Sequence, residues 1–157
     1  MELLLIVVVF AAVLALSYAA FSFFKVKKMD EGTDRMKEIA SAIRIGANAF
    51  INYELKIIAI VAVVVAALLA IFISWQAGIT FLIGATMSEC AGFIGMKIAT
   101  YANVRVANKA RLTKSLGETL KVAFRGGSVM GLCVGGFALL GIVIVYLVFG
   151  LGLGQLT

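Results

Sequence analysis

The sequence predicts an all-α integral membrane protein with four transmembrane helices. Of the 157 residues, 63% are hydrophobic and 14% are charged, whereas a soluble domain has about 45–50% apolar and about 25% charged residues. The charges are also segregated, because all 14 lysines and arginines fall within residues 25–56 and 97–125. Long uncharged stretches precede, separate and follow these two windows, and each is long enough to cross a bilayer once or twice.

The first predicted transmembrane helix covers residues 3–24, "LLLIVVVFAAVLALSYAAFSFF". A helix needs about 20 apolar residues to cross the hydrocarbon core, and this stretch satisfies that length. A secretory signal peptide would carry a cation before a shorter apolar core. Neither feature is present, so the stretch is interpreted as a membrane span.

Residues 57–88 contain 32 positions without a charge, too many for one ordinary span and few for two. The sequence "SWQAGIT" from Ser74 suggests a tight turn beside an interfacial tryptophan, Trp75. The second helix is therefore predicted at 35–75, with its membrane part at 57–75, and the third at 78–101. The fourth is predicted at 126–149, with "GLGLGQLT" as a terminal tail.

The charge map supports this count of spans. With four spans, both cationic windows lie on one side of the membrane, whereas three spans would separate them. Lysine and arginine accumulate in cytoplasmic loops, so the loops at about 25–56 and 102–125 are expected inside and both chain termini outside. The same distribution argues against a nucleic-acid partner and makes the lipid bilayer the expected one.

The first cationic window contains an amphipathic segment. Apolar residues recur at helical spacing from Met36 to Phe50, and Thr33 is positioned to cap the start, with Asp34 in the first turn. No proline interrupts the chain. The segment is either a continuous extension of the second helix or an interfacial helix lying flat on the membrane.

Three acids in this window, Asp30, Asp34 and Glu38, are spaced four residues apart. On one helix they would share a face, as a magnesium site needs. Gly32 is expected to break the helix, and basic residues are interleaved. A solvated loop face followed by a helix start is the alternative, and neither a catalytic residue nor a metal ligand is assigned.

Two further positions are candidates for chemistry. Arg125 precedes two glycines in "FRGGSVMG", where a helix N-terminus could hold a phosphate; a loop break before a packing stripe explains the same residues. Glu89 is an acid within a predicted span. It is either an ion carrier or a protonated acid bonded to a neighbouring helix.

Small residues recur every four positions on the third and fourth predicted helices, which favours close helix packing. These residues are Gly84, Ser88, Gly92, Gly127, Gly131 and Gly135, with a second series at Ala91, Gly95 and Ala99. Histidine is absent, and Cys90 and Cys133 lie in apolar runs, where they are interpreted as packing residues.

Three longer stretches carry a family resemblance. They are "GTDRMKEIASAIRIGANAFINYELKIIAI" from Gly32, "GMKIATYANVRVANKAR" from Gly95 and "LKVAFRGGSVMGLCVGGFALLGIVIVYLVFG" from Leu120. Their order and spacing resemble the N-terminal part of the membrane-bound, ion-translocating inorganic pyrophosphatases. The similarity runs from about residue 30 to the C-terminus.

The resemblance implies that the chain is a partial segment of a larger helical bundle. Family members are much longer homodimeric membrane pumps, which hydrolyse magnesium pyrophosphate on the cytoplasmic side and move protons or sodium ions outward, and the expected location is a prokaryotic cell membrane. Their substrate and Mg²⁺ ligands lie on helices after the fourth, so this chain alone is expected to lack a catalytic site and a cofactor. The expected partners are the remaining helices of the pump. The alternative is an autonomous small transporter subunit that uses Glu89 as its charge carrier.

Overall fold

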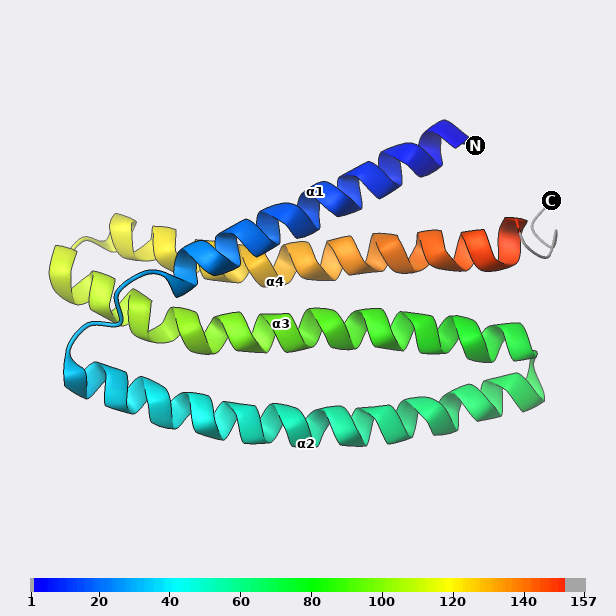
Figure 1. Cartoon of the computed structure of the whole chain (residues 1–157), viewed down its shortest axis with the longest axis horizontal. Helices are drawn as coiled ribbons and strands as arrows, with labels where there is room; N and C mark the ends of the chain where they lie inside the picture. Colours follow the sequence, from blue (N-terminus) through cyan, green and yellow to red (C-terminus); the bar gives the residue numbers. More distant parts are fainter. Residues whose placement is uncertain (1, 152–157) are drawn as a thin grey trace.

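The computed structural model describes residues 2–151, which form four long α-helices and a terminal π-helical turn (Figure 1). Helix α1 spans Glu2–Lys27, α2 spans Asp34–Phe72, α3 spans Trp75–Thr113, α4 spans Leu116–Val145, and η1 continues α4 over Tyr146–Leu151. Four helices in this part of the chain are long and apolar enough to cross a membrane. The predicted all-α membrane class with four spanning helices is confirmed. The predicted tail lies mostly outside the described residues.

Helix α2 is continuous from the cationic window into the apolar stretch. Thr33 caps its start by accepting a hydrogen bond from the Met36 amide at 3.4 Å, and Asp34 lies in the first turn, where the helix dipole favours a negative charge. Gly32 has φ +94°, a conformation that keeps α1 from running into α2. Of the two arrangements predicted for this segment, the structure has the continuous extension.

The turn between α2 and α3 lies three residues earlier than predicted. Ser74 is extended and accepts a hydrogen bond from the Ala77 amide at 3.2 Å, which caps a helix starting at Trp75. The prediction placed the turn at Gln76 and Gly78 from their turn propensity. A serine cap fixes the start of α3 more strongly, and Gly78 is instead used for close packing inside the helix.

The predicted connection at 102–125, between the third and fourth helices, is wrong in extent. Only residues 28–33 and 114–115 lie outside helices at this end of the chain. Lys114 ends α3 in a left-handed conformation, with φ 50°, and α4 starts two residues later. The predicted loops began where the apolar stretches ended. However, Ala, Lys and Arg are good helix formers in water, so α3 and α4 continue well beyond the apolar stretches.

The helices form an open row in the order α2, α3, α4, α1 (Figure 1). Helix α2 packs mainly against α3, and α1 packs mainly against α4, so each lies at an edge of the row. The start of α1, the α2–α3 turn and the end of η1 lie at one end of the row. We call the other end, which holds the connections at 28–33 and 114–115, the cationic end.

The core lies between α1, α3 and α4 and is built mainly from small or β-branched side chains. Its buried members are Ala19, Val26, Ala91, Ile98, Ala102, Val129 and Cys133. By contrast, α2 buries only Ala40, Ile51 and Ala66 among its described residues. Large apolar side chains of α1 and α2 are therefore left uncovered, as expected for surfaces that face lipid or further helices.

Candidate functional site

Arg105 is the centre of a polar cluster at the cationic end. Its side chain is only 5% exposed, and its guanidinium donates hydrogen bonds to three backbone carbonyls. Two of these belong to the end of α1 and the connection after it, Lys27 at 2.7 Å and Met29 at 3.0 Å, and the third is Tyr101 on α3 at 2.7 Å. One buried guanidinium therefore satisfies the carbonyls where α1 ends and holds that end against α3.

Glu31 supplies the negative charge of this cluster. Its carboxylate accepts two hydrogen bonds from Arg44 on α2, at 2.7 and 3.2 Å, and lies 3.0 Å from Arg105. The hydrogen bond from Arg44, together with the charge of Arg105, holds the pKa of Glu31 below its usual value of 4.5. Glu31 thus joins α2 to α3 through two guanidinium groups.

Asn108 completes the cluster, one turn beyond Arg105. It is 3% exposed, and its amide donates to the Asp30 carbonyl at 3.2 Å and to the Asp30 carboxylate at 3.3 Å. Its own side-chain oxygen accepts from Arg111 at 2.9 Å. The Gly32 amide and Asn108 together lower the pKa of Asp30. Hydrogen bonds and an ion pair from Arg105 and Asn108 therefore hold the connection at 28–33 against α3.

Sequence reasoning did not identify Arg105, Asn108, Glu31 or Arg44. A signal was available, because Tyr101, Arg105 and Asn108 have the spacing of one helix face. Tyr101 contributes its ring to this face, with the guanidinium carbons of Arg44 and Arg105 at 5.6 and 5.7 Å from the ring centroid. This helix face was missed because the predicted helix ended at residue 101, before Arg105 and Asn108.

The candidate magnesium ligands do not come together. Asp34 pairs with Lys37 at 3.2 Å and Glu38 pairs with Arg35 at 2.7 Å, both on the exposed first turns of α2. Asp30 lies in the preceding connection. No group of three or more acidic, histidine or cysteine side chains within residues 2–151 could hold a metal ion. Because two of the three acids are paired with cations and the three do not come together, they do not fit a Mg²⁺ site.

The predicted helix N-terminus at Arg125 is wrong. Helix α4 begins at Leu116, so the amides following Arg125 are inside the helix and are not free to bind a phosphate. Arg125 is half-buried and lines a cavity at the cationic end. Gly126 contacts Ala102 on α3 closely, since an added Cβ would lie 2.9 Å from the Ala102 methyl group.

Glu89 is half-buried on α3, about 21 Å along the helix axis from its start at Trp75. Lys97 does not pair with it, because the Lys97 ammonium bonds to Asn48 on α2 and lies over the Phe93 ring. A second acid, Glu54, lies on α2. One of its carboxylate oxygens is buried without a hydrogen-bond partner among the described residues. No ion pathway follows from these two acids.

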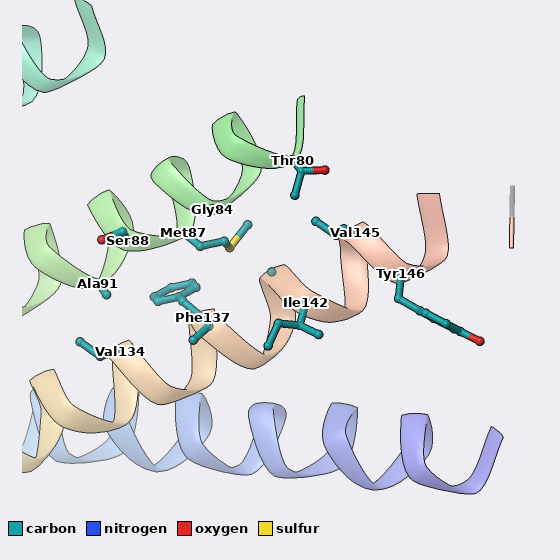
Figure 2. A pocket seen from close by; sticks show the side chains of 12 residues that line it. Thr80, Gly84, Met87, Ser88, Ala91, Val134, Phe137, Ile142, Val145 and Tyr146 are labelled. Atoms are coloured by element: carbon teal, nitrogen blue, oxygen red, sulfur yellow. The ribbon is translucent and has the colours of Figure 1, made fainter. Parts of the chain in front are cut away.

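An apolar groove of about 560 Å³ lies between α3 and α4, towards the end opposite the cationic end (Figure 2). Gly84 and Ser88 line it from α3, and Phe137 and Ile142 line it from α4. Both α3 residues were predicted to pack helices. Here they are exposed, and an added Cβ at Gly84 would meet nothing within 4 Å.

The other glycines of the first predicted series show the same behaviour. An added Cβ would meet nothing within 4 Å at Gly92, Gly127, Gly131 and Gly135. The close contacts are made one position away or on other faces, at Gly78, Gly95, Gly126 and Gly136. The first predicted series therefore does not join the four helices to one another, and its role in packing against helices outside this chain stays a prediction. The second series does pack inside the chain, since Ala91 is buried in the core and an added Cβ at Gly95 would lie 2.6 Å from the Met130 side chain on α4.

Comparison with protein families decides where the chain belongs. The model of the inorganic H⁺ pyrophosphatase family matches residues 13–155. The chain belongs to this family. All four membrane-spanning helices lie wholly or largely inside the matched region, so the pyrophosphatase family resemblance extends to the whole row of helices.

Individual pyrophosphatase relatives agree with the family match. The chain is 60% identical over 141 residues to the "K(+)-stimulated pyrophosphate-energized sodium pump" of Thermotoga maritima. It is 41% identical over 152 residues to the "K(+)-insensitive pyrophosphate-energized proton pump" of Methanosarcina mazei, and 44% identical over 139 residues to "proton pump 2" of the same type in Moorella thermoacetica. These matches cover 90%, 96% and 88% of this chain but 19%, 22% and 20% of the respective relatives.

Proposed function

We propose that this chain forms the N-terminal transmembrane helices of a pump that couples pyrophosphate hydrolysis to the transport of protons or sodium ions. The observation that carries the proposal is the combination of family membership with an incomplete helical row. The chain spans about a fifth of the length of its pump relatives. Its four helices leave the apolar edges of α1 and α2 and the groove between α3 and α4 uncovered. Further helices of the pump are the partners that match these surfaces.

In this proposal the chain does not hydrolyse pyrophosphate by itself. Catalysis needs several carboxylates to hold Mg²⁺ and cations to neutralise the phosphates, all positioned within a fraction of an ångström. At the cationic end, Glu31, Asp34 and Glu38 are instead paired with neighbouring cations, and the Asp30 carboxylate accepts a hydrogen bond from Asn108. Mg²⁺ and its ligands are therefore assigned to the rest of the pump. A role as an independent transporter through Glu89 is not proposed, because no observation favours it.

The proposed setting is a prokaryotic cell membrane. The cationic end, which holds the connections at 28–33 and 114–115, faces the cytoplasm, since both windows of lysine and arginine lie there. The chain termini then face the outside. The pump is proposed to be a homodimer, as the family resemblance implies.

The test is reconstitution with the remainder of a relative. The chain is co-expressed with the Thermotoga maritima sodium pump from which the matching segment has been deleted, and pyrophosphate hydrolysis is measured in membrane vesicles. We expect hydrolysis only when both parts are present, and none from the isolated chain in detergent. Hydrolysis by the isolated chain would contradict the proposal, as would failure of the chain to restore activity when it is folded and inserted.

A groove variant sharpens this test. Gly84→Phe places a large side chain into the α3–α4 groove, whose position 84 has no neighbour within 4 Å. We expect this variant to insert normally but to restore less than about a tenth of the activity, because a packed helix cannot tolerate the added ring. Gly46→Phe on α2 is the matched control, since position 46 is also open but lies outside the groove.

A further inference from the structure

A second cavity, of about 480 Å³, lies at the cationic end between the connection after α1, helix α3 and helix α4. Unlike the apolar groove, it is lined mainly by charged side chains. The cations are Arg105, Lys109, Lys121 and Arg125, and the acids are Asp30 and Glu118. The lining therefore carries a net charge of +2 and attracts an anion.

The cations of this cavity are not all neutralised within the chain. Lys121 lies 2.6 Å from Glu118, and Lys109 is left with a longer contact of 3.7 Å to the same carboxylate. The guanidinium of Arg125 has no hydrogen bond, ion pair or ring contact with any described residue, although the side chain is half-buried. A half-buried guanidinium with five free N–H donors is a site that favours an oxyanion.

The position of Arg125 relative to the membrane surface indicates that the anion is a lipid phosphate. Trp75 and Tyr101 lie at opposite ends of the apolar part of α3, about 39 Å apart along the helix axis. That distance matches a bilayer with its headgroup layers, about 40–45 Å, and aromatic residues of this kind mark the two interfaces. Because Gly126 contacts Ala102, Arg125 lies at the level of Tyr101 and hence among the lipid phosphates.

We propose that this cavity binds the phosphate group of an anionic phospholipid, with Arg125 as the bidentate donor and Lys109 as the second cation. Basic pockets between transmembrane helices at the membrane surface are suited to such headgroups. A free pyrophosphate is a poorer match, because its multiple negative charges would face the carboxylates of Asp30 and Glu118. This site is independent of the proposed pump function.

Native mass spectrometry of the purified chain tests the proposal. The protein is titrated in detergent with phosphatidylglycerol and, separately, with phosphatidylcholine. We expect one tightly bound phosphatidylglycerol, with an affinity at least about tenfold above that for phosphatidylcholine. The double variant Arg125→Gln/Lys109→Gln should bind phosphatidylglycerol about tenfold to thirtyfold more weakly, while Arg125→Lys alone, which keeps the charge but loses the bidentate geometry, should show a smaller but measurable loss.

The control Lys28→Gln/Lys114→Gln removes the same charge from side chains that do not line the cavity. It should change the affinity by less than about threefold, because both side chains are exposed and do not line the cavity, so water and salt screen their charges. Equal losses in both double variants, or undiminished binding in Arg125→Gln/Lys109→Gln, would overturn the site. Displacement of the lipid by sodium pyrophosphate at equimolar concentration would overturn the lipid as its ligand.

Discussion

At the scale of single residues, Arg105 shows how a buried charge can organise a connection between membrane helices. Its guanidinium reaches the carbonyls of Lys27 and Met29 as well as the carboxylate of Glu31. A buried charge is costly unless it is paired and hydrogen-bonded, and here both conditions are met. The cluster therefore fixes the end of α1, although that helix has few contacts with α3 elsewhere.

Replacing Arg105 should accordingly destabilise the protein. We expect Arg105→Gln to lower the free energy of unfolding by about 2–3 kcal/mol, since charged hydrogen bonds are lost and buried carbonyls are left without donors. Arg35→Gln is the control, because that side chain is 75% exposed and pairs only with Glu38 on the same helix; its effect should stay within about 0.5 kcal/mol. Unfolding of both variants by sodium dodecyl sulfate in mixed micelles gives the comparison, and equal losses would contradict the role of Arg105.

The pKa of Glu31 predicts a pH dependence. Arg44 and Arg105 lower it in the folded protein below its reference value of 4.5, so the unfolded chain binds the proton more readily. The stabilisation by Glu31 is therefore present above pH 4.5 and is lost as the pH falls through the lower folded-state pKa. The protection of the amides in residues 28–33 against hydrogen exchange, measured relative to their intrinsic rates at each pH, should fall over that acidic range in the native protein.

Glu31→Gln provides the comparison for this prediction. It should exchange faster already at neutral pH and show a flatter dependence on acid, because the ionisable partner of Arg44 and Arg105 is gone. Glu38→Gln, in an exposed pair, should behave like the native chain. An identical acid response in the native protein and in Glu31→Gln would show that another group is responsible.

At the scale of helices, the position of each glycine decides whether it matters for packing. An added Cβ at Gly78 would lie 2.7 Å from the backbone carbonyl of Ala66 and 2.9 Å from the methyl group of Ala70. Backbone atoms cannot move aside cheaply, so α2 and α3 would have to separate. At Gly84, two turns further along the same helix, the space is open.

These contacts predict opposite effects of the same substitution. Gly78→Ala should lower the free energy of unfolding by about 1–3 kcal/mol through overpacking. Gly84→Ala should be neutral or stabilising by up to about 1 kcal/mol, because alanine is the better helix former. Thermal unfolding of the isolated chain, followed by circular dichroism, measures both, and a stable Gly78→Ala would mean that α2 and α3 are not held at this separation.

The helices themselves could be predicted from the sequence, but the cluster between them could not. Apolar length and the charge windows identified the four spans, because the bilayer imposes a strict length on each. Thr33 and Gly32 were also interpreted correctly, since caps and glycine turns depend on local geometry. Arg105 and Asn108 were missed because their partners lie more than 70 residues away along the chain. Likewise, helix propensity alone did not show that α3 continues to Thr113.

At the scale of the whole molecule, the open row makes a prediction about topology. The α2–α3 turn at 73–74 lies opposite the connections at 28–33 and 114–115 (Figure 1). In a background without native cysteines, cysteines introduced at Lys28 and Lys114 should be protected from a membrane-impermeant maleimide in intact cells, while one at Ile73 should be labelled. All three positions are exposed, so protection reports the membrane side. Labelling at Lys114 from outside would contradict the proposed orientation.

The length of α3 has a mechanical consequence. Its 39 residues extend over about 58 Å, nearly twice the hydrocarbon thickness of about 30 Å. No proline interrupts it, so we expect the helix to tilt as one rigid rod about a point within the bilayer, with its C-terminal end in water. With that point midway between Trp75 and Tyr101, about 38 Å from Thr113, a tilt of about 10° would displace the end of the helix by about 7 Å. A small tilt of α3 within the lipid therefore produces a large displacement of its C-terminal end, where α4 is joined to it by only two residues.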